Sequence, residues 1–196
     1  MALPAVQAWR RLHPEAHLAL LVKPGLAGLW KLHGAPDEIL TYTHGLGATL
    51  AAARRVRAGR FDRVFVLPHS IRSALVPFLA GVPERVGLPG SGRALMLHRV
   101  VQPSPDPARR HQGFEYLDLL APDASLRVLE PPQLILPAEA RAEAARLAGD
   151  LPAPRLVVLP GAARGPAKRW PSVHFAAVAG RWIADFRGSV LLLGGR

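Results

Sequence analysis

The sequence has 196 residues, 49% of them hydrophobic and 20% charged, which is the composition of a folded protein long enough for one large domain or for one and part of another. No apolar run approaches the ~18–20 residues that span a bilayer, and the absence of cysteine excludes disulfide scaffolds and Cys-ligated zinc sites. The formal net charge of +11 suits an anionic partner such as a nucleic acid, an anionic lipid or a phosphorylated small molecule, although GC-rich coding explains the same arginine excess.

Strand and helix patterns alternate along the first half of the chain. An amphipathic helix is expected over Ala5–Leu12, and the continuous, β-branched run Arg63–Leu67 is typical of a buried central strand. The other expected elements of this half are strands at His17–Val22, Glu38–Thr41 and Arg85–Leu88, and helices at Gly25–His33, Leu46–Ala58 and Ile71–Ala80. Short turns separate them, as in βαβ units built on a parallel sheet.

The second half continues the alternation after a proline-rich, basic loop at Pro103–Arg110. The expected elements are helices at Gln112–Leu120, Pro137–Gly149 and Ser172–Asp185, and strands at Gln133–Leu136, Leu156–Leu159 and Ser189–Leu193. Leu151–Pro154 has the composition of a linker, so we expect two domains, 1–150 and 151–196. The chain opens inside a helix and stops at glycines after a strand, and we expect both ends to be truncated.

The glycine- and alanine-rich loop Pro160–Pro171 has the properties of a diphosphate site. The small residues Gly161, Ala162 and Ala163 let the backbone approach a ligand closely, and Lys168 and Arg169 add two cations near the start of a helix. The loop has neither the P-loop spacing nor the Rossmann glycine pattern. An ordinary glycine-rich turn with solvated cations is therefore the alternative.

A second polar loop follows the strand Arg63–Leu67. Ligands bind at the carboxyl ends of strands in open α/β sheets, and this loop carries His69, Ser70, Arg72 and Ser73. We expect Ser70 to cap the following helix while His69 and Arg72 face a cleft. The alternatives are a capping serine with surface neighbours, or a Ser70–His69 nucleophilic pair, which the absence of a GxSxG elbow disfavours.

The remaining candidate residues are less specific. The other histidines lack metal-ligand spacing, so no metal site is expected. Trp170 either stacks on a base or packs in the protein, and Arg109–His111 is a basic loop that is either solvated or faces an anionic acceptor. No close pair of carboxylates is available for acid–base catalysis.

Three stretches resemble signatures of glycosyltransferase family 9, the lipopolysaccharide heptosyltransferases, and especially of its heptosyltransferase II branch. Pro160–Pro171, continuing to Ala176, is similar to the donor-site signature of the family. Leu67–Leu88 is similar to its second signature, in which Asn is common at the position of His69, and Met1–Val6 resembles the middle of its first motif.

The resemblance implies an α/β fold of GT-B type, with two Rossmann-like parallel-sheet domains, the first lacking its first strand and the second incomplete. The domain 1–150 would hold the acceptor, the lipid A–Kdo inner core, and 151–196 would begin the domain for the donor, ADP-L-glycero-D-manno-heptose. It also implies inverting transfer without a metal or other cofactor. We expect a cytoplasmic monomer in peripheral contact with the anionic inner membrane, and no nucleic-acid partner.

The resemblance further implies roles for single residues. Lys168 matches the lysine that contacts the donor phosphates, with the 161–163 backbone and Arg169 beside it, and Trp170 shapes the same loop. Ser70, Arg72 and Ser73 match a polar loop on the acceptor side, and His69 lies in the same loop at the position where the family commonly has Asn. The aspartate that serves the family as general base precedes the position of Met1. We therefore expect no catalytic residue in this chain, and no useful activity from it alone.

Two other classes of function stay open. A basic nucleotide- or nucleic-acid-binding module would interleave aromatic with basic residues along one face, and the aromatics of this sequence are not arranged in that way. An esterase that uses Ser70 would need the missing nucleophile elbow.

Overall fold

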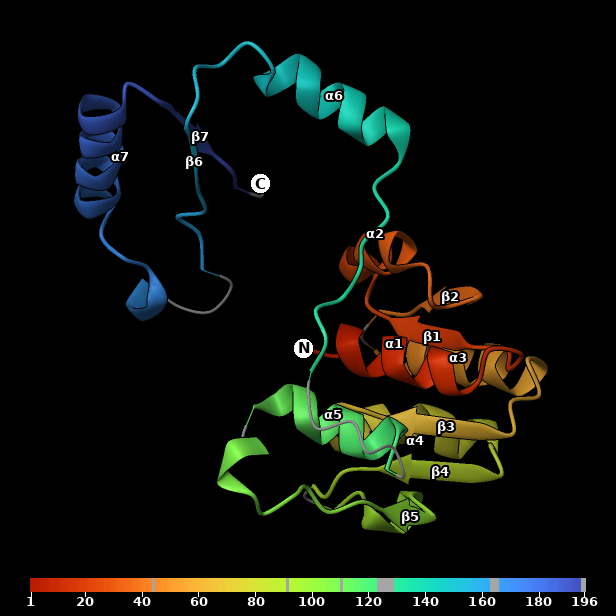
Figure 1. The fold of residues 1–196 in the computed structure, drawn as a ribbon. Coiled ribbons are helices and arrows are strands. Elements are labelled where there is room, and N and C mark those ends of the chain that lie inside the picture. The colour runs from red at the N-terminus through yellow and green to blue at the C-terminus, as the bar shows by residue number, and fades with distance from the viewer. Residues whose placement is uncertain (44, 91, 110, 123–128, 163–165, 195–196) are drawn as a thin grey trace. The chain divides into compact units, whose positions relative to one another are not determined.

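The computed structural model describes the chain except residues 44, 91, 110, 123–128, 163–165 and 195–196, and it divides into two compact units, Met1–Ile135 and Leu136–Arg196 (Figure 1). The division lies ahead of the predicted boundary after residue 150, so helix α6 (Ala138–Ala148) falls in the second unit. Each unit is described by itself.

The first unit alternates helices and strands as the sequence predicts. Its elements are α1 (Leu3–Leu12), β1 (Ala19–Val22), α2 (Pro24–His33), β2 (Glu38–Thr41), α3 (Leu46–Ala58), β3 (Arg63–Val66), α4 (Ile71–Ala80), β4 (Glu84–Gly87), η1 (Ala94–Met96), β5 (Arg99–Val100), η2 (Pro107–Arg109) and α5 (Gln112–Leu120). The predicted helices and strands up to Leu120 are confirmed with small shifts at their ends. The short elements η1, β5 and η2 were not predicted.

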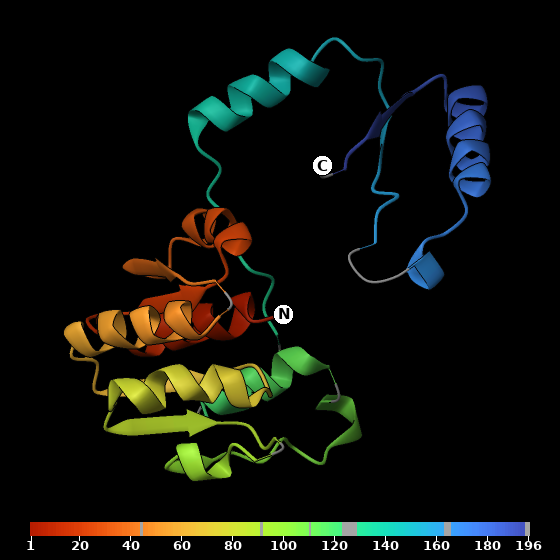
Figure 2. The same cartoon turned by 180° about the vertical axis from the view of Figure 1, so that it is seen from behind.

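The strand pairs described in this unit are parallel. β1 pairs with β2, and β3, β4 and β5 form a second ladder in that order. Helices α1 and α5 pack together on one side of the strands (Figure 1), and α3 and α4 pack together on the other, which faces the viewer in Figure 2. Because parallel strands end at one edge, the loops after β1, β2, β3 and β4 share the carboxyl edge of the strands.

Each side of the strands has its own buried apolar cluster. The cluster on the α1 side includes Val6, Val86 and Leu119, and the cluster on the α3 side includes Ala52 and Val76. Burial of apolar side chains on both faces is the usual property of parallel sheets. These layers hold the strands in place and thereby position the loops at their ends.

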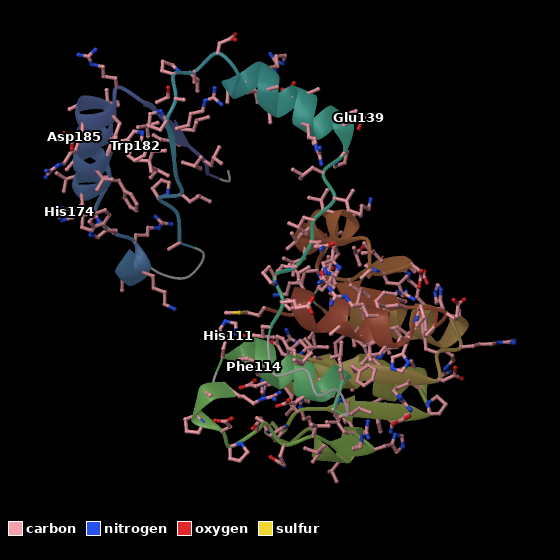
Figure 3. The ribbon with its side chains drawn as sticks, viewed as in Figure 1. His111, Phe114, Glu139, His174, Trp182 and Asp185 are labelled. Atoms are coloured by element: carbon pink, nitrogen blue, oxygen red, sulfur yellow. The ribbon has the colours of Figure 1, made fainter. Side chains whose placement is uncertain are left out.

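The second unit contains one βαβ arrangement. Its elements are α6, β6 (Arg155–Val158), η3 (Pro166–Lys168), α7 (Ser172–Phe186) and β7 (Ser189–Leu192), with β6 parallel to β7. Trp182, labelled in Figure 3, donates its indole N–H to the carbonyl of Pro154 at 3.2 Å. Gly188 also packs directly on that carbonyl, where a Cβ would clash. These contacts fix α7 beside the start of β6.

The prediction of a strand at Gln133–Leu136 is wrong. The N–H of Ile135 donates to the carbonyl of Leu32 at the end of α2 (2.7 Å), and the N–H of Gln133 donates to the side chain of Gln7 (3.0 Å). These partners are single groups on helices and not a strand ladder. A short apolar run does not by itself specify a strand.

None of the helices within the described ranges is long and apolar enough to cross a bilayer.

Candidate functional site

The two predicted loops lie in different units: His69, Ser70, Arg72 and Ser73 follow β3 in the first unit, and the loop Pro160–Pro171 follows β6 in the second. Both stand at the carboxyl end of a parallel strand, as the sequence predicts. Ala163, together with Arg164 and Gly165, lies outside the described residues.

Ser70 is the N-cap of α4. Its hydroxyl oxygen accepts the N–H of Ser73 at 3.3 Å, and the Ser73 hydroxyl donates to the carbonyls of Ser70 (2.6 Å) and Pro68 (2.9 Å). Both hydroxyls are thus engaged in holding the turn. Since the described contacts of Ser70 are with Ser73 and not with His69, the arrangement favours the capping interpretation over a nucleophilic pair.

His69 connects three segments at the carboxyl edge. Its Nδ1 lies 3.1 Å from the carbonyl of Pro89, in the loop after β4, and its Nε2 lies 3.4 Å from the Glu115 carboxylate in the first turn of α5. Both facing atoms are hydrogen-bond acceptors, and each lies close to one of the two ring nitrogens. His69 therefore connects the loop after β3 to the loop after β4 and to α5.

Arg93 braces the same loops from inside. Its side chain is fully buried, and its guanidinium donates to the carbonyl of Leu88 through Nε (2.9 Å) and Nη2, and to the carbonyl of Pro68 through Nη1. Burial lowers the pKa of this guanidinium below its usual range. Gly90 approaches the carbonyl of His69 so closely that a Cβ would lie 2.5 Å from it. The loops after β3 and β4 are therefore locked together.

Sequence analysis missed both Arg93 and Glu115. The available signal for Glu115 was an acidic residue in the first turn of a helix at this edge. For Arg93 there was none, because nothing in the local pattern distinguishes a buried arginine from a surface one.

The remaining cations near this edge differ in their surroundings. Arg72 is exposed in the first turn of α4, a turn without an acidic residue. Arg109 is only about one-fifth exposed, pairs with Asp118 and lies over the ring of Phe114, with 5.0 Å between the guanidinium carbon and the ring centroid. His111, beside Phe114 in Figure 3, caps α5 by accepting the N–H of Gly113 at 3.1 Å. In the predicted basic loop at 109–111, the described residues Arg109 and His111 are thus both bonded to other groups of the protein.

The loop after β6 has the opposite character, since its cations are exposed. Within the described part of the chain, the side chains of Lys168 and Arg169 have no ion-pair or hydrogen-bond partner. A Cβ built on Gly161 would meet no atom within 4 Å, and the backbone of Gly161 is open to a ligand. Ala162, next to it, is half-buried.

Helix α7 begins directly after these cations. Its N-cap, Pro171, offers no side-chain acceptor, and its first turn has no acidic residue, so the positive end of the helix dipole is not neutralised from within. Trp170 stacks on His174 (ring centroids 5.1 Å apart) and meets Phe175 edge-on (5.0 Å), which ties the loop to α7. The tryptophan remains 51% exposed. The loop therefore offers two cations, open backbone and a helix N-terminus to an anion.

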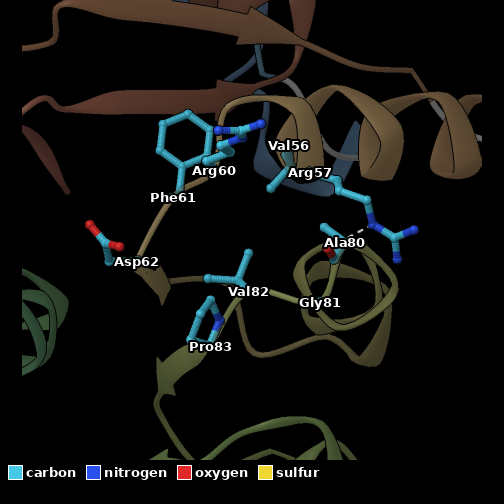
Figure 4. Close-up of a pocket in the computed structure, with 9 residues that line it drawn as sticks. All are labelled: Val56, Arg57, Arg60, Phe61, Asp62, Ala80, Gly81, Val82 and Pro83. Carbon is cyan, nitrogen blue, oxygen red and sulfur yellow. Dashed lines mark hydrogen bonds between the residues drawn. The ribbon is translucent and has the colours of Figure 1, made fainter.

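The structure also has a cavity of about 220 Å³ at the opposite edge of the first unit, between the ends of α3 and α4 and the starts of β3 and β4 (Figure 4). Arg57 borders it and donates to the carbonyls of Ala80 (3.1 Å) and Leu79 (2.8 Å) at the end of α4. This cation is used to cap a helix C-terminus. The cavity contains none of the predicted site residues.

Both loops fall within the segment that comparison with known families identifies. Residues 49–196 match the model of "Glycosyltransferase family 9 (heptosyltransferase)". The chain belongs to glycosyltransferase family 9. The predicted resemblance is confirmed, and the match includes every predicted site residue.

Curated relatives agree with this assignment. The chain is 34% identical over 194 residues to lipopolysaccharide heptosyltransferase 2 of Escherichia coli K12, covering 93% of this chain and 56% of the relative. It is 32% identical over 171 residues to lipooligosaccharide heptosyltransferase 2 of Haemophilus influenzae, covering 80% of this chain and 48% of the relative. The chain spans about half the length of the curated relatives it matches.

Solved structures give the same fold. The E. coli structure described as ADP-heptose lps heptosyltransferase II has a TM-score of 0.79 at 26% identity, covering 99% of this chain and 60% of that one. A family 9 glycosyltransferase from Veillonella parvula has a TM-score of 0.80 at 19% identity, covering 99% and 58%. The predicted α/β fold with parallel strands is confirmed, and its structural neighbours are of GT-B type.

Proposed function

We propose that this chain is part of a glycosyltransferase that moves L-glycero-D-manno-heptose from ADP-heptose to the lipopolysaccharide inner core. The loop between β6 and α7 carries the proposal. It lies in the segment that matches family 9, and its exposed cations at a helix N-terminus have no partner among the described residues. In this proposal the second unit holds the donor and the first unit borders the acceptor. The relatives' names support the sugar and the acceptor.

The proposed reaction is a direct displacement with inversion. An acceptor hydroxyl attacks the anomeric carbon, the bond from that carbon to the diphosphate oxygen breaks, and the electron pair leaves with ADP. Lys168, Arg169 and the N–H groups at the start of α7 stabilise the negative charge that grows on the departing diphosphate. In this proposal the backbone of Gly161 and Ala162 lies beside the phosphates, and Trp170 holds the loop against α7.

On the acceptor side, the first unit contributes a fixed surface. His69, Ser70 and Ser73 give the loop its shape through the bonds described above, and Arg72 faces the anionic inner core. The net charge of +11 supports contact of a monomer with the anionic inner face of the bacterial inner membrane.

The proton of the acceptor hydroxyl must pass to a base. Among the described residues around the first loop, the carboxylate at hand is Glu115, and it faces His69. The resemblance to the family implies that the base is an aspartate ahead of the position of Met1. We therefore propose that the 196-residue chain alone turns over slowly or not at all, since loss of a general base costs about 10²–10⁴-fold in rate. Turnover of ADP-heptose on a heptose-bearing acceptor at the rate of an intact family member would contradict this.

Titration of the chain with ADP and with inorganic diphosphate, followed by backbone NMR, tests the donor loop. We expect both ligands to shift the amides of Gly161, Ala162 and the first turn of α7. Lys168→Ala should weaken binding about three- to tenfold, the effect of one partly exposed charge-assisted contact. Arg181→Ala, which removes an 85% exposed arginine paired with Asp185, serves as the matched control. Equal affinities of the two variants would refute the role of Lys168.

A further inference from the structure

The cavity in Figure 4 lies at the edge of the first unit opposite to the His69–Ser70 loop. The ends of α3 and α4 and the starts of β3 and β4 enclose a volume of about 220 Å³. Gly81 and Pro83 of its lining are exposed, so a ligand can enter from solvent. A protein cavity of about 150 Å³ holds one benzene molecule. The space at this edge therefore accepts a ligand with one small ring or a short chain and a polar group.

Most of the described side chains that line the cavity are apolar. Val56, Ala80 and Val82 are buried and belong to one apolar cluster. The rings of Phe61 and Pro83 complete this part of the lining. Since these side chains offer no hydrogen bond to a ligand, the part of a ligand that enters between them has to be apolar.

The ring of Phe61 is a fixed wall of the cavity. The ring of His17 stacks on it, with centroids 6.2 Å apart and an angle of 12° between the planes. Gly59 approaches the same ring so closely that a Cβ would lie 2.4 Å from a ring carbon. The ring is therefore held by the protein itself, and the cavity is formed before a ligand binds.

Arg60, between Gly59 and Phe61, has an unusual backbone conformation. Its φ is +49°, in the left-handed region that favours glycine, whereas Gly59 has a φ of −72° that any residue can adopt. Gly59 is needed where it stands because of the Phe61 ring, and the left-handed position falls to an arginine. Such strain at a residue that can bind a ligand points to a functional role.

Two of the charged side chains described at the cavity are directed elsewhere. The guanidinium of Arg57 donates to the carbonyls of Leu79 and Ala80 at the end of α4. The carboxylate of Asp62 points away from the other lining side chains (Figure 4). Neither side chain is placed to hold a polar group of a ligand inside the cavity.

The guanidinium of Arg60 is the group available to a ligand. Figure 4 shows it between the ring of Phe61 and Val56, at the boundary of the apolar walls. Among the described residues it has no hydrogen-bond or ion-pair partner. A guanidinium binds a carboxylate through two parallel hydrogen bonds, which satisfies both carboxylate oxygens at once.

We propose that this cavity is a binding site for small carboxylates with an apolar body, with the carboxylate on Arg60 and the body between Phe61 and Val82. Inorganic phosphate fits less well, because the apolar walls leave its remaining oxygens without donors. The inference does not rest on the proposed transferase activity, since the cavity contains none of the residues proposed for it.

Backbone NMR of the chain titrated with benzoate tests the proposal. We expect saturable shifts of the amides of Phe61, Gly81 and Val82, with a Kd of about 1–10 mM for a ligand of this size. Benzyl alcohol keeps the ring without the charge, and inorganic phosphate keeps the charge without the ring. Each should bind at these amides at least about threefold more weakly than benzoate.

Arg60→Gly removes the guanidinium and keeps the fold, because glycine adopts the left-handed conformation without strain. Arg187→Gly is the matched control, since Arg187 is also exposed, also has a left-handed φ (+51°) and lies in the second unit. We expect Arg60→Gly to weaken benzoate binding about three- to tenfold and the control to leave it unchanged.

Three results would overturn the proposal. They are equal affinity of the native chain and Arg60→Gly for benzoate, equal shifts of the cavity amides by phosphate and benzoate, and benzoate shifts confined to Gly161 and the start of α7. The last result would place the anion on the loop after β6 and leave the proposed function intact. A failure of ADP to shift the amide of Gly161 would count against the proposed function alone.

Discussion

Replacement of Arg93 by methionine tests whether the buried guanidinium holds the loops after β3 and β4. Methionine has a similar length and no charge, so it keeps part of the packing and removes the donors. In the native chain these donors serve the carbonyls of Leu88 and Pro68, and the side chain has no exposed surface. The variant leaves the carbonyl of Leu88 without its partner, whereas the carbonyl of Pro68 loses one bond and keeps the one from the Ser73 hydroxyl.

The expected loss of stability follows from those two acceptors. The orphaned acceptor of Leu88 costs about 1–3 kcal/mol, and the one bond lost at the carbonyl of Pro68 adds about 0.5–1.5 kcal/mol. Part of this is recovered, because the variant no longer takes a charged group out of water. We expect a net destabilisation of about 1–3 kcal/mol, which is large for a domain whose total stability is about 5–15 kcal/mol.

Urea unfolding followed by circular dichroism measures this change. Arg99→Met is the matched control, since Arg99 is half-exposed and its Nη2 lies 3.9 Å from Glu84, so its loss should cost under about 0.5 kcal/mol. If Arg93→Met costs less than about 1 kcal/mol, the guanidinium does not brace the loops and the reasoning is refuted.

Three further substitutions test the first unit. Burial lowers the pKa of His33 below 6.5, so the folded state is most stable above about pH 6.5 and loses stability as the pH falls toward the folded-state pKa of this residue. His33→Leu should therefore flatten the decline in the urea midpoint between about pH 7 and pH 5. An unchanged decline would contradict this. The backbone N–H of Leu18 and the side chain of Arg10 lower the pKa of Asp37. The ionised carboxylate therefore stabilises the fold at pH values above the pKa that Asp37 has in the unfolded chain, and this contribution is lost in acid. Asp37→Asn should lower the melting temperature at about pH 7 and leave it nearly unchanged at about pH 2. His69→Asn loses the reach to Glu115 and should speed hydrogen exchange at the start of α4 about threefold or more, with no change in overall unfolding beyond about 1 kcal/mol.

The order of elements was predictable because its signals are local. The apolar run before Pro68 and the glycines after α3 and α4 mark where elements end, and the structure follows them. The prediction at 133–136 failed for a physical reason: an apolar tetrapeptide becomes a strand only if a neighbouring strand pairs with it through backbone hydrogen bonds. Here the N–H of Ile135 instead donates to the carbonyl of Leu32 at the end of α2.

The site was only partly predictable, for a related reason. Ser70 as a cap, and Lys168 and Arg169 at a helix start, follow from residues a few positions apart. Arg93 reaches Pro68 across 25 positions, and Glu115 meets His69 from another helix. Such contacts depend on which strands are neighbours, and this order is set by packing of the whole unit and not by a local pattern.

The contrast between the two loops indicates a division of labour. After β3, the hydroxyls, the imidazole and the buried guanidinium are all bonded to the protein, so this loop presents a shape fixed before any ligand binds. After β6, the cations Lys168 and Arg169 are exposed and unpaired within the described residues, so this loop presents charge. A leaving diphosphate needs charge stabilisation as its bond breaks, and an attacking hydroxyl needs orientation more than charge. Charge-removing substitutions in the loop after β6 should therefore weaken phosphate binding. Substitutions in the loop after β3 should loosen that loop and leave the affinity of the chain for phosphate unchanged.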